Sequence, residues 1–247
     1  SGGGSITAIG ANATGIRAYD GTGGAITIDN AGDIVASDTG SGASYHGVAA
    51  GIDAIANAEG GSAAITNSGD ISATGDMGGA GIRVTSVGIG ASASVDNIGT
   101  IYAASSPDGK YTSMGIDVAA DGDVFAINAG SITAYSGGLG LGMSARSLAG
   151  DVLVLNSGDI VATGNALPGY GGAYAILSAS QNGSALAANA GSLGATNPLG
   201  IAFGITADGA TYSSATNSGD VTSDGKYSRG IFATSSLGDV VVQNSGS

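Results

Sequence analysis

Apolar and polar residues alternate in short stretches along almost the whole chain. Ile26 and Ile28 alternate with Thr27 and Asp29, and the same alternation returns in later stretches such as 152–155. A period of two places successive side chains on opposite faces of an extended strand. The pattern therefore predicts many short β-strands, each with one face turned inward.

Two short motifs mark every repeat of this alternation. The first is Asn-x-Gly followed by a small polar or acidic residue, and its copies are 27 to 37 residues apart. The second is Gly-Ile or a close variant, and it precedes each Asn by 13 to 16 residues. Its copies are Gly15-Ile16, Gly51-Ile52, Gly81-Ile82, Gly115-Ile116, Gly142-Met143, Ala175-Ile176, Gly204-Ile205 and Gly230-Ile231. Paired motifs in a constant order indicate an internally repeated fold.

Each repeat contains three predicted strands. The first strand starts at Gly-Ile, the second ends at the Asn, and the third starts after the Gly of Asn-x-Gly. No helical stretch separates them, and a repeat of this length fits one coil of a parallel β-solenoid, whose coils stack about 4.8 Å apart. The sequence predicts an all-β parallel β-helix of about eight coils, forming a single domain over residues 1–247.

The length of the repeat varies mainly after the third strand. The variable segments are residues 37–50, 104–114, 163–174 and 196–203, and they contain Pro107, Pro168 and Pro198. Proline cannot donate to a β-ladder. We therefore expect these segments to be excursion loops outside the stacked strands.

The Asn-x-Gly motif is interpreted as a structural corner. The Asn lies at an inward position, where stacked amides can form a hydrogen-bonded ladder along the axis. The expected ladder is Asn30, Asn67, Asn97, Asn128, Asn156, Asn189, Asn217 and Asn244. The Gly is expected to supply a positive φ at the corner, at Gly32, Gly69, Gly99, Gly130, Gly158, Gly191, Gly219 and Gly246.

No cofactor is expected, and a repeated calcium site is the alternative for this motif. It would use the residue after the Gly, which is Asp33, Asp70, Asp159 or Asp220. Other coils have Thr100, Ser131 or Ser192 there, so no continuous acidic row exists.

Two outward rows stand out. The residue after Gly-Ile runs Arg17, Asp53, Arg83, Asp117, which predicts a ladder of alternating charges; a site for an acidic sugar is the alternative. On the second strands, outward apolar residues occupy three consecutive coils at Phe125, Ile127, Leu153, Leu155 and Leu186. A patch of this kind needs a cover, which would be an excursion, a partner or another copy of the chain.

Tyrosines are expected in the excursions, at Tyr45, Tyr111, Tyr170, Tyr174 and Tyr227. Tyrosine on a loop over a rigid rod is well suited to contact sugars or proteins. It is equally compatible with an ordinary exposed surface residue.

Composition narrows the function. The chain has 48 Gly, no Cys and a formal charge of −13, with only six Lys and Arg. This balance opposes nucleic-acid binding and a polybasic membrane contact. His46 is the only histidine and Glu59 the only glutamate, so a His-centred site or a Glu pair is not expected. We predict a protein that is not an enzyme and does not insert into a membrane.

The repeated sequence pattern is represented by the stretch Val152-Leu153-Val154-Leu155-Asn156-Ser157-Gly158-Asp159-Ile160-Val161-Ala162, which is followed by the next Gly-Ile. This pattern resembles the passenger region of bacterial autotransporters and related large exoproteins. The resemblance covers almost the whole chain. It implies a right-handed β-solenoid displayed outside the bacterial cell, and commonly adhesion or biofilm formation. The implied partners are a protein or glycan on a host or neighbouring cell, or other copies of the chain.

Two other functions remain open from the sequence. The chain begins and ends at one phase of the repeat, so we expect a segment of a longer array or a unit that stacks end to end into a filament. A polysaccharide-active enzyme or a phage tailspike is the third possibility for a β-helix.

Overall fold

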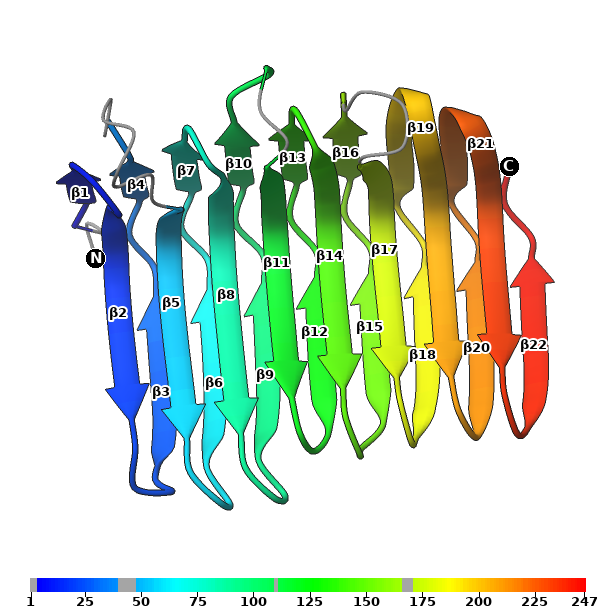
Figure 1. Ribbon diagram of the computed structural model, residues 1–247, viewed down its shortest axis with the longest axis horizontal. Coiled ribbons are helices and arrows are strands. Elements are labelled where there is room, and N and C mark those ends of the chain that lie inside the picture. The colour runs from blue at the N-terminus through cyan, green and yellow to red at the C-terminus, as the bar shows by residue number, and fades with distance from the viewer. Residues whose placement is uncertain (1–3, 40–47, 109–110, 166–170) are drawn as a thin grey trace.

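The computed structural model describes residues 4–39, 48–108, 111–165 and 171–247. They form an all-β solenoid of about seven turns, in which equivalent strands of successive coils pair in parallel (Figure 1). The prediction of a β-solenoid is confirmed, and the expected eight coils differ from it only slightly.

The three strands of each repeat keep the order that the sequence predicts. The first strands are β2 (Thr14–Asp20), β5 (Ala49–Asn57), β8 (Gly79–Val87), β11 (Thr112–Ala120), β14 (Leu139–Ser147) and β17 (Gly172–Ser180). The second strands are β3 (Ala25–Asn30), β6 (Ser62–Asn67), β9 (Ser92–Asn97), β12 (Val124–Asn128), β15 (Val152–Asn156), β18 (Ser184–Asn189), β20 (Tyr212–Asn217) and β22 (Asp239–Asn244). The third strands are β1 (Ile6–Ile9), β4 (Ile34–Ser37), β7 (Ile71–Gly75), β10 (Ile101–Ser105), β13 (Ile132–Ser136) and β16 (Ile160–Gly164).

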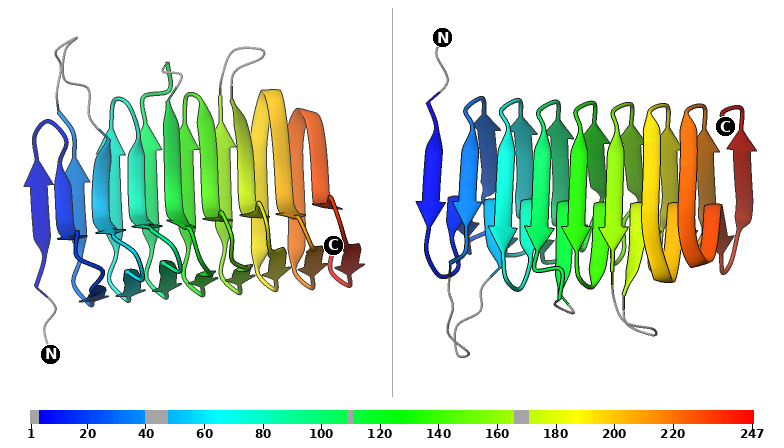
Figure 2. Two further views of the ribbon diagram at one scale, coloured as in Figure 1. Left: turned by 60° about the horizontal axis from the view of Figure 1, so that its bottom comes forward. Right: turned by 90° about the horizontal axis from the view of Figure 1, so that it is seen from above.

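Two longer strands join two faces of the solenoid. β19 (Ser192–Gly209) and β21 (Asp220–Ser235) each combine a third strand with the following first strand. They therefore connect the first and third strands into one 14-stranded sheet, while the second strands form a separate 8-stranded sheet. The two views in Figure 2 show these continuous bends near the C-terminal end of the rod.

The interior consists of aligned rows of small and β-branched residues. Ile34, Ile71, Ile101, Ile132 and Ile160 stack in register from coil to coil, each with an exposed fraction of 2% or less. Alanine fills the next inward position of the same strands. This strict register explains the period-two pattern, because each inward residue packs on its own equivalent. Among the described residues, no helix is long and apolar enough to cross a bilayer.

The expected excursion at 196–203 is wrong. These residues belong to β19, and Pro198 lies where the pairing of β19 with β21 shifts register, between Asn197 and Ile201. A proline is tolerated there because the ladder is already interrupted and no hydrogen bond from its nitrogen is required. In the other three variable segments one described strand ends and the next begins: β4 ends at Ser37 and β5 begins at Ala49, β10 ends at Ser105 and β11 begins at Thr112, and β16 ends at Gly164 and β17 begins at Gly172.

Candidate functional site

The eight asparagines of the repeated motif form a hydrogen-bonded ladder along the corner of the rod. Each Nδ2 donates to Oδ1 of the Asn in the next coil, at 2.7–2.8 Å, from Asn30 through to Asn244. Each Nδ2 also donates to the carbonyl oxygen of the Gly two residues later, as Asn156 does to Gly158 at 2.6 Å. The internal amides are 6% exposed or less. A buried amide with all its partners is stabilising, and one without them is costly.

The reason for the corner glycines differs from the expected one. None of Gly32, Gly69, Gly99, Gly130, Gly158, Gly191, Gly219 and Gly246 has a positive φ. A Cβ at any of them would instead overlap the carbonyl oxygen of the corner residue in the preceding coil, which is Gly4 for the first and a corner glycine for the others. Glycine is required because two backbones approach closely, so the expectation of a left-handed turn is corrected to a steric requirement between coils.

The glycine of the Gly-Ile motif has a related role inside the core. A Cβ at Gly142 would overlap Cγ2 of Ile160 in the third strand of the same coil. One coil has Ala175 at this position, and that coil carries Leu193 where the others have a β-branched residue. Leucine has no methyl group on Cβ, so it leaves space for the alanine methyl. The two exceptions to the repeat therefore compensate each other.

The variable acidic position after the Gly serves the backbone of the next coil. Oδ1 of Asp33 accepts a hydrogen bond from the N–H of Asp70, and Oδ1 of Asp70 accepts one from the N–H of Thr100. Within the described ranges, no group of three or more His, Cys, Asp or Glu residues is arranged to hold a metal ion. Asp33 and Asp70 therefore help to hold successive coils together.

The charged row after Gly-Ile lies in register across β2, β5, β8 and β11. Nε of Arg83 donates to Oδ1 of Asp53 at 2.8 Å, and Nε of Arg17 lies 3.6 Å from Oδ2 of the same carboxylate. The Asp53 side chain is 2% exposed, whereas that of Arg17 is 65% exposed. The hydrogen bond to Asp53 raises the pKa of Arg83 above its ordinary value. The carboxylate is covered while the guanidinium groups face outward.

The fourth residue of the charged row, Asp117, pairs with an arginine outside the row. Oδ1 of Asp117 accepts a hydrogen bond from Nη2 of Arg146 at 2.7 Å, while the row position next to Asp117 is occupied by Ser144. Arg146 lies one outward row further along β14, so the expected straight ladder is diagonal here. Burial raises the pKa of the Asp117 carboxyl, and the nearby Arg146 opposes that increase.

The same face carries an aromatic cluster that we did not expect. The rings of Tyr174 and Phe203 meet edge to face with centroids 5.2 Å apart, and Phe232 lies 6.1 Å from Phe203. The guanidinium of Arg229 lies 4.3 Å from the centroid of Phe232. The sequence signal was present, since Tyr174, Phe203 and Arg229 each directly precede a Gly-Ile-type motif.

The apolar row on the second strands is exposed, and a groove adjoins it. Phe125 is paired with Leu153, which is paired with Leu186, and Phe125 is 46% exposed. The neighbouring row contains Ile127 and Leu155, which are 38% and 36% exposed. A groove of about 590 Å³ begins beside Ile127 and Leu155 and continues over Ala188, Thr216 and Gln243 in the next three coils. It runs along the asparagine corner of the rod.

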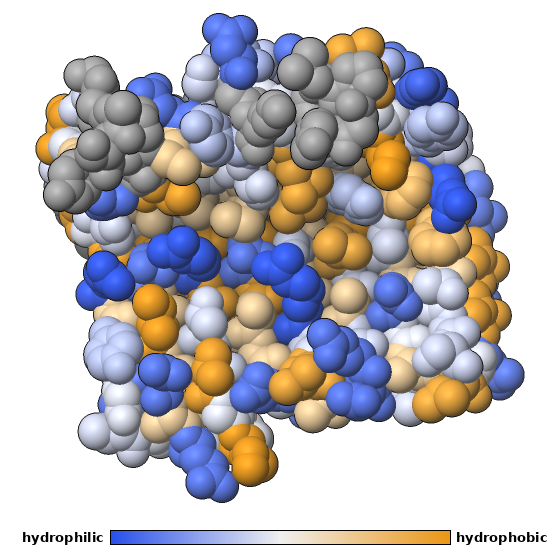
Figure 3. Space-filling view, viewed as in Figure 1, coloured by the Kyte–Doolittle hydropathy of each residue, from blue (hydrophilic) through white to orange (hydrophobic). Residues whose placement is uncertain are grey.

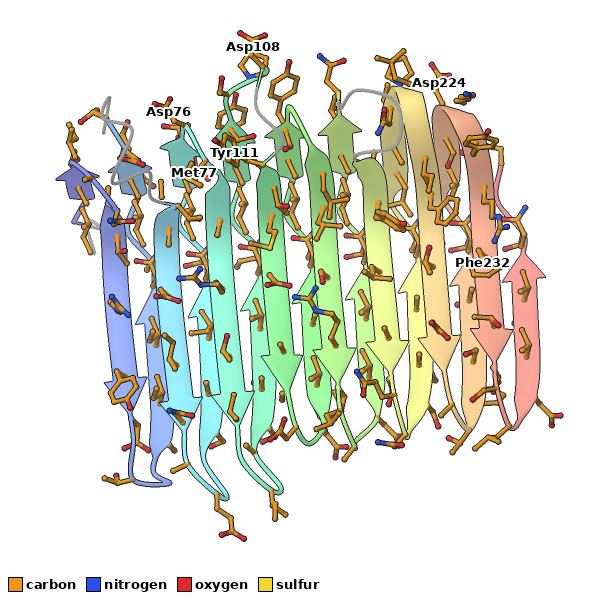
Figure 4. The ribbon with its side chains drawn as sticks, in the orientation of Figure 1. Asp76, Met77, Asp108, Tyr111, Asp224 and Phe232 are labelled. Atoms are coloured by element: carbon orange, nitrogen blue, oxygen red, sulfur yellow. The ribbon has the colours of Figure 1, made fainter. Side chains whose placement is uncertain are left out.

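The tyrosines do not form one set. Tyr45 and Tyr170, and also His46, lie outside the described residues. Tyr111 precedes β11 at the loop edge of the rod, together with Asp108, as the side-chain view shows (Figure 4). Tyr174 and Tyr227 lie in strands β17 and β21, so their assignment to loops is wrong; Tyr227 is nevertheless 63% exposed.

No family model, curated protein or solved structure matches this chain.

Proposed function

We propose that this chain is a segment of a non-enzymatic rod displayed at the bacterial cell surface, an adhesin-type passenger region that makes cell or biofilm contacts through its outer surfaces. The observation that carries the proposal is the apolar patch (Phe125, Ile127, Leu153, Leu155 and Leu186) beside the corner groove. Contiguous exposed apolar residues on a folded protein mark interaction sites.

The repeated positions and the variable positions have different roles, which supports this proposal. The recurring residues are used by the scaffold: the asparagines bond each other, and the corner glycines leave room for the backbone of the preceding coil. The outward rows vary from coil to coil, so they are free to carry recognition. Sequence resemblance to autotransporter passengers adds the expectation of export, and of a protein or glycan on another cell, or another copy of the chain, as partner.

The test compares two variants that add the same charge at equivalent positions. Leu153→Asp with Leu155→Asp places two carboxylates in the apolar patch. The matched control, Ala64→Asp with Thr66→Asp, occupies the same two outward rows three coils away. Beads coated with each protein are added to a panel of bacterial and mammalian cells, and self-association is measured by sedimentation.

We expect the patch variant to lose at least about tenfold in cell retention or in self-association, because hot-spot apolar contacts are lost. The control variant should retain both. Unchanged adhesion and unchanged self-association in the patch variant would remove this proposal.

The two other functions predict different results. A filament protein would form long end-to-end assemblies in sedimentation, independent of the patch variant. A polysaccharide-active enzyme would shorten polysaccharides, and Asp53→Asn or Asp117→Asn would abolish that activity. A stable monomer or short oligomer without depolymerising activity is the result that the adhesin proposal expects.

A further inference from the structure

All four arginines of the chain lie on the outer side of the first strands, which we call the arginine face. Arg17 is on β2, Arg83 on β8, Arg146 on β14 and Arg229 on β21. The outward rows that carry them also hold three aspartates, Asp53, Asp117 and Asp208. Four arginines and three aspartates give this face a formal charge of +1, although the whole chain carries −13. In Figure 3, hydrophilic residues form a band across the left half of this face.

The charges on this face are sorted by depth. The side chains of Asp53 and Asp117 are 2% and 10% exposed, whereas those of Arg83 and Arg146 are 33% and 46% exposed. A ligand that approaches the face therefore meets guanidinium groups before it meets these carboxylates. Asp208 is the one exposed carboxylate of the three.

The buried carboxylates also hold the arginines in position. Among the described residues, Arg83 bonds Asp53 through Nε, so its two Nη groups remain available to an external anion. Arg146 uses only Nη2 for Asp117. Side chains that are already ordered lose less conformational entropy on binding, and a guanidinium with free N–H groups can bond a carboxylate with two donors.

The arginines recur on alternate coils along the rod. Arg17, Arg83 and Arg146 belong to the first, third and fifth first strands in the pairing order. Neighbouring strands are about 4.8 Å apart, so alternate coils are separated by about 9.6 Å. A linear ligand that lies along the axis would thus meet a cation at every second step over these five coils, whereas Arg229 lies apart on the eighth.

The aromatic cluster continues the same face beyond Arg146 and includes the position of Arg229. Tyr174, Phe203 and Phe232 occupy the last three coils, and Phe232 lies on the outer side of β21 (Figure 4). A shallow cavity of about 490 Å³ is lined by Phe203, Tyr227 and Arg229, with Ile201 and Ser228. Aromatic rings combine an apolar face with a polar edge, which suits the mixed surface of a sugar ring.

We propose that the arginine face binds a linear acidic polysaccharide that carries a carboxylate on every second sugar. The chain of sugars runs along the rod, with carboxylates on the guanidinium groups of alternate coils and with terminal sugars against the aromatic cluster. This inference deepens the proposed function, because it names the glycan class that such a surface rod would contact.

The test measures binding of the whole chain to defined polymers. The probes are hyaluronan oligosaccharides (a carboxylate on every second sugar), oligogalacturonate (a carboxylate on every sugar), neutral cello-oligosaccharides and poly-glutamate. Arg17→Gln and Arg146→Gln remove cations from the face. Ala64→Asp is the matched control, because it lowers the net charge by the same one unit at an exposed position of the separate second-strand sheet. Arg17→Lys keeps the charge, and a circular dichroism melt of each variant checks the fold.

We expect hyaluronan to bind best, and each arginine substitution to weaken its binding about tenfold, which corresponds to about 1.4 kcal/mol. Arg17→Lys keeps the charge but not the two donors of the guanidinium, so it should weaken binding less than Arg17→Gln does. Ala64→Asp should change binding less than about threefold, and added salt should weaken binding. Equal binding of neutral sugars, equal loss in Ala64→Asp, or preference for poly-glutamate would overturn the inference. If the rod binds hyaluronan but no cell retains the coated beads, the adhesin proposal falls and this inference stands.

Discussion

A single methyl group added at Gly142 tests how the core of the solenoid is packed. The Cβ of Gly142→Ala would overlap Cγ2 of Ile160 and would lie 2.6 Å from the carbonyl oxygen of Ala175 in the next coil. Carbon atoms are optimally about 3.5–4.0 Å apart. Either the isoleucine or the backbone must therefore move.

The magnitude follows from these contacts. Overpacking a core costs about 1–3 kcal/mol, and replacing glycine with alanine recovers about 0.4–1 kcal/mol through the unfolded chain. We expect Gly142→Ala to lower the free energy of unfolding by about 1–2 kcal/mol. Ile160→Leu alone should cost less than about 1.5 kcal/mol, because side-chain volume is kept. The double variant should lose at least about 1 kcal/mol less than the sum, because the overlapping methyl group is gone.

Urea unfolding followed by circular dichroism measures the free energy of unfolding of the wild type, the two single variants and the double variant. Another coil supplies the reverse experiment, since Ala175 already stands opposite Leu193. Leu193→Ile should recreate the overlap and destabilise by a similar amount, and adding Ala175→Gly should restore most of the stability. If the free-energy changes of Gly142→Ala and Ile160→Leu add within about 0.5 kcal/mol, the two side chains do not compete for the same space in the core.

Three further predictions concern single positions. Asn156→Ala should lower the free energy of unfolding by about 1–3 kcal/mol because neighbouring amides lose partners, and an unchanged melting temperature would count against the ladder. Gly130→Asn should be strongly destabilising because its Cβ overlaps a backbone carbonyl. Gly60→Asn, at φ +72° in open space, should cost less than about 1 kcal/mol. If both variants melt at the temperature of the wild type, the corner glycine is not required by close approach of the neighbouring coil. Burial raises the pKa of Asp117, so its protonated form contributes stability below the unfolded pKa of about 3.9 that is lost as the pH rises. In urea titrations the stability of Asp117→Asn relative to wild type should therefore increase as the pH rises above about 4; a difference between the two proteins that does not change with pH would contradict this.

The repeated features of the fold were predictable because each residue meets its own equivalent in the next coil. Once Asn67 and Asn97 are given the same strand position, stacking of their amides follows from geometry. The reason for Gly99 was not predictable in the same way. The sequence shows that glycine is required there, but it does not show how closely the backbone of the neighbouring coil approaches.

Features that break the repeat were harder to predict. Pro198 suggested an excursion because proline interrupts ladders, yet an existing register shift accommodates it within β19. Arg146 was missed because its ion pair with Asp117 crosses two rows diagonally, and a row-by-row comparison finds only aligned pairs. The aromatic residues before Gly-Ile were visible in the sequence, but their convergence on one face depends on the bend at the motif.

Retention of protein-coated beads by cells tests whether the repeated motifs build the scaffold while the outer rows make the contacts. Beads carry the wild type, the Leu153→Asp and Leu155→Asp variant, or the Ala64→Asp and Thr66→Asp control. We predict that cells retain beads with the wild type and the control, and do not retain beads with the patch variant, at a temperature where circular dichroism shows all three proteins folded. Equal retention of all three proteins, or no retention of the wild type on any cell, would contradict it.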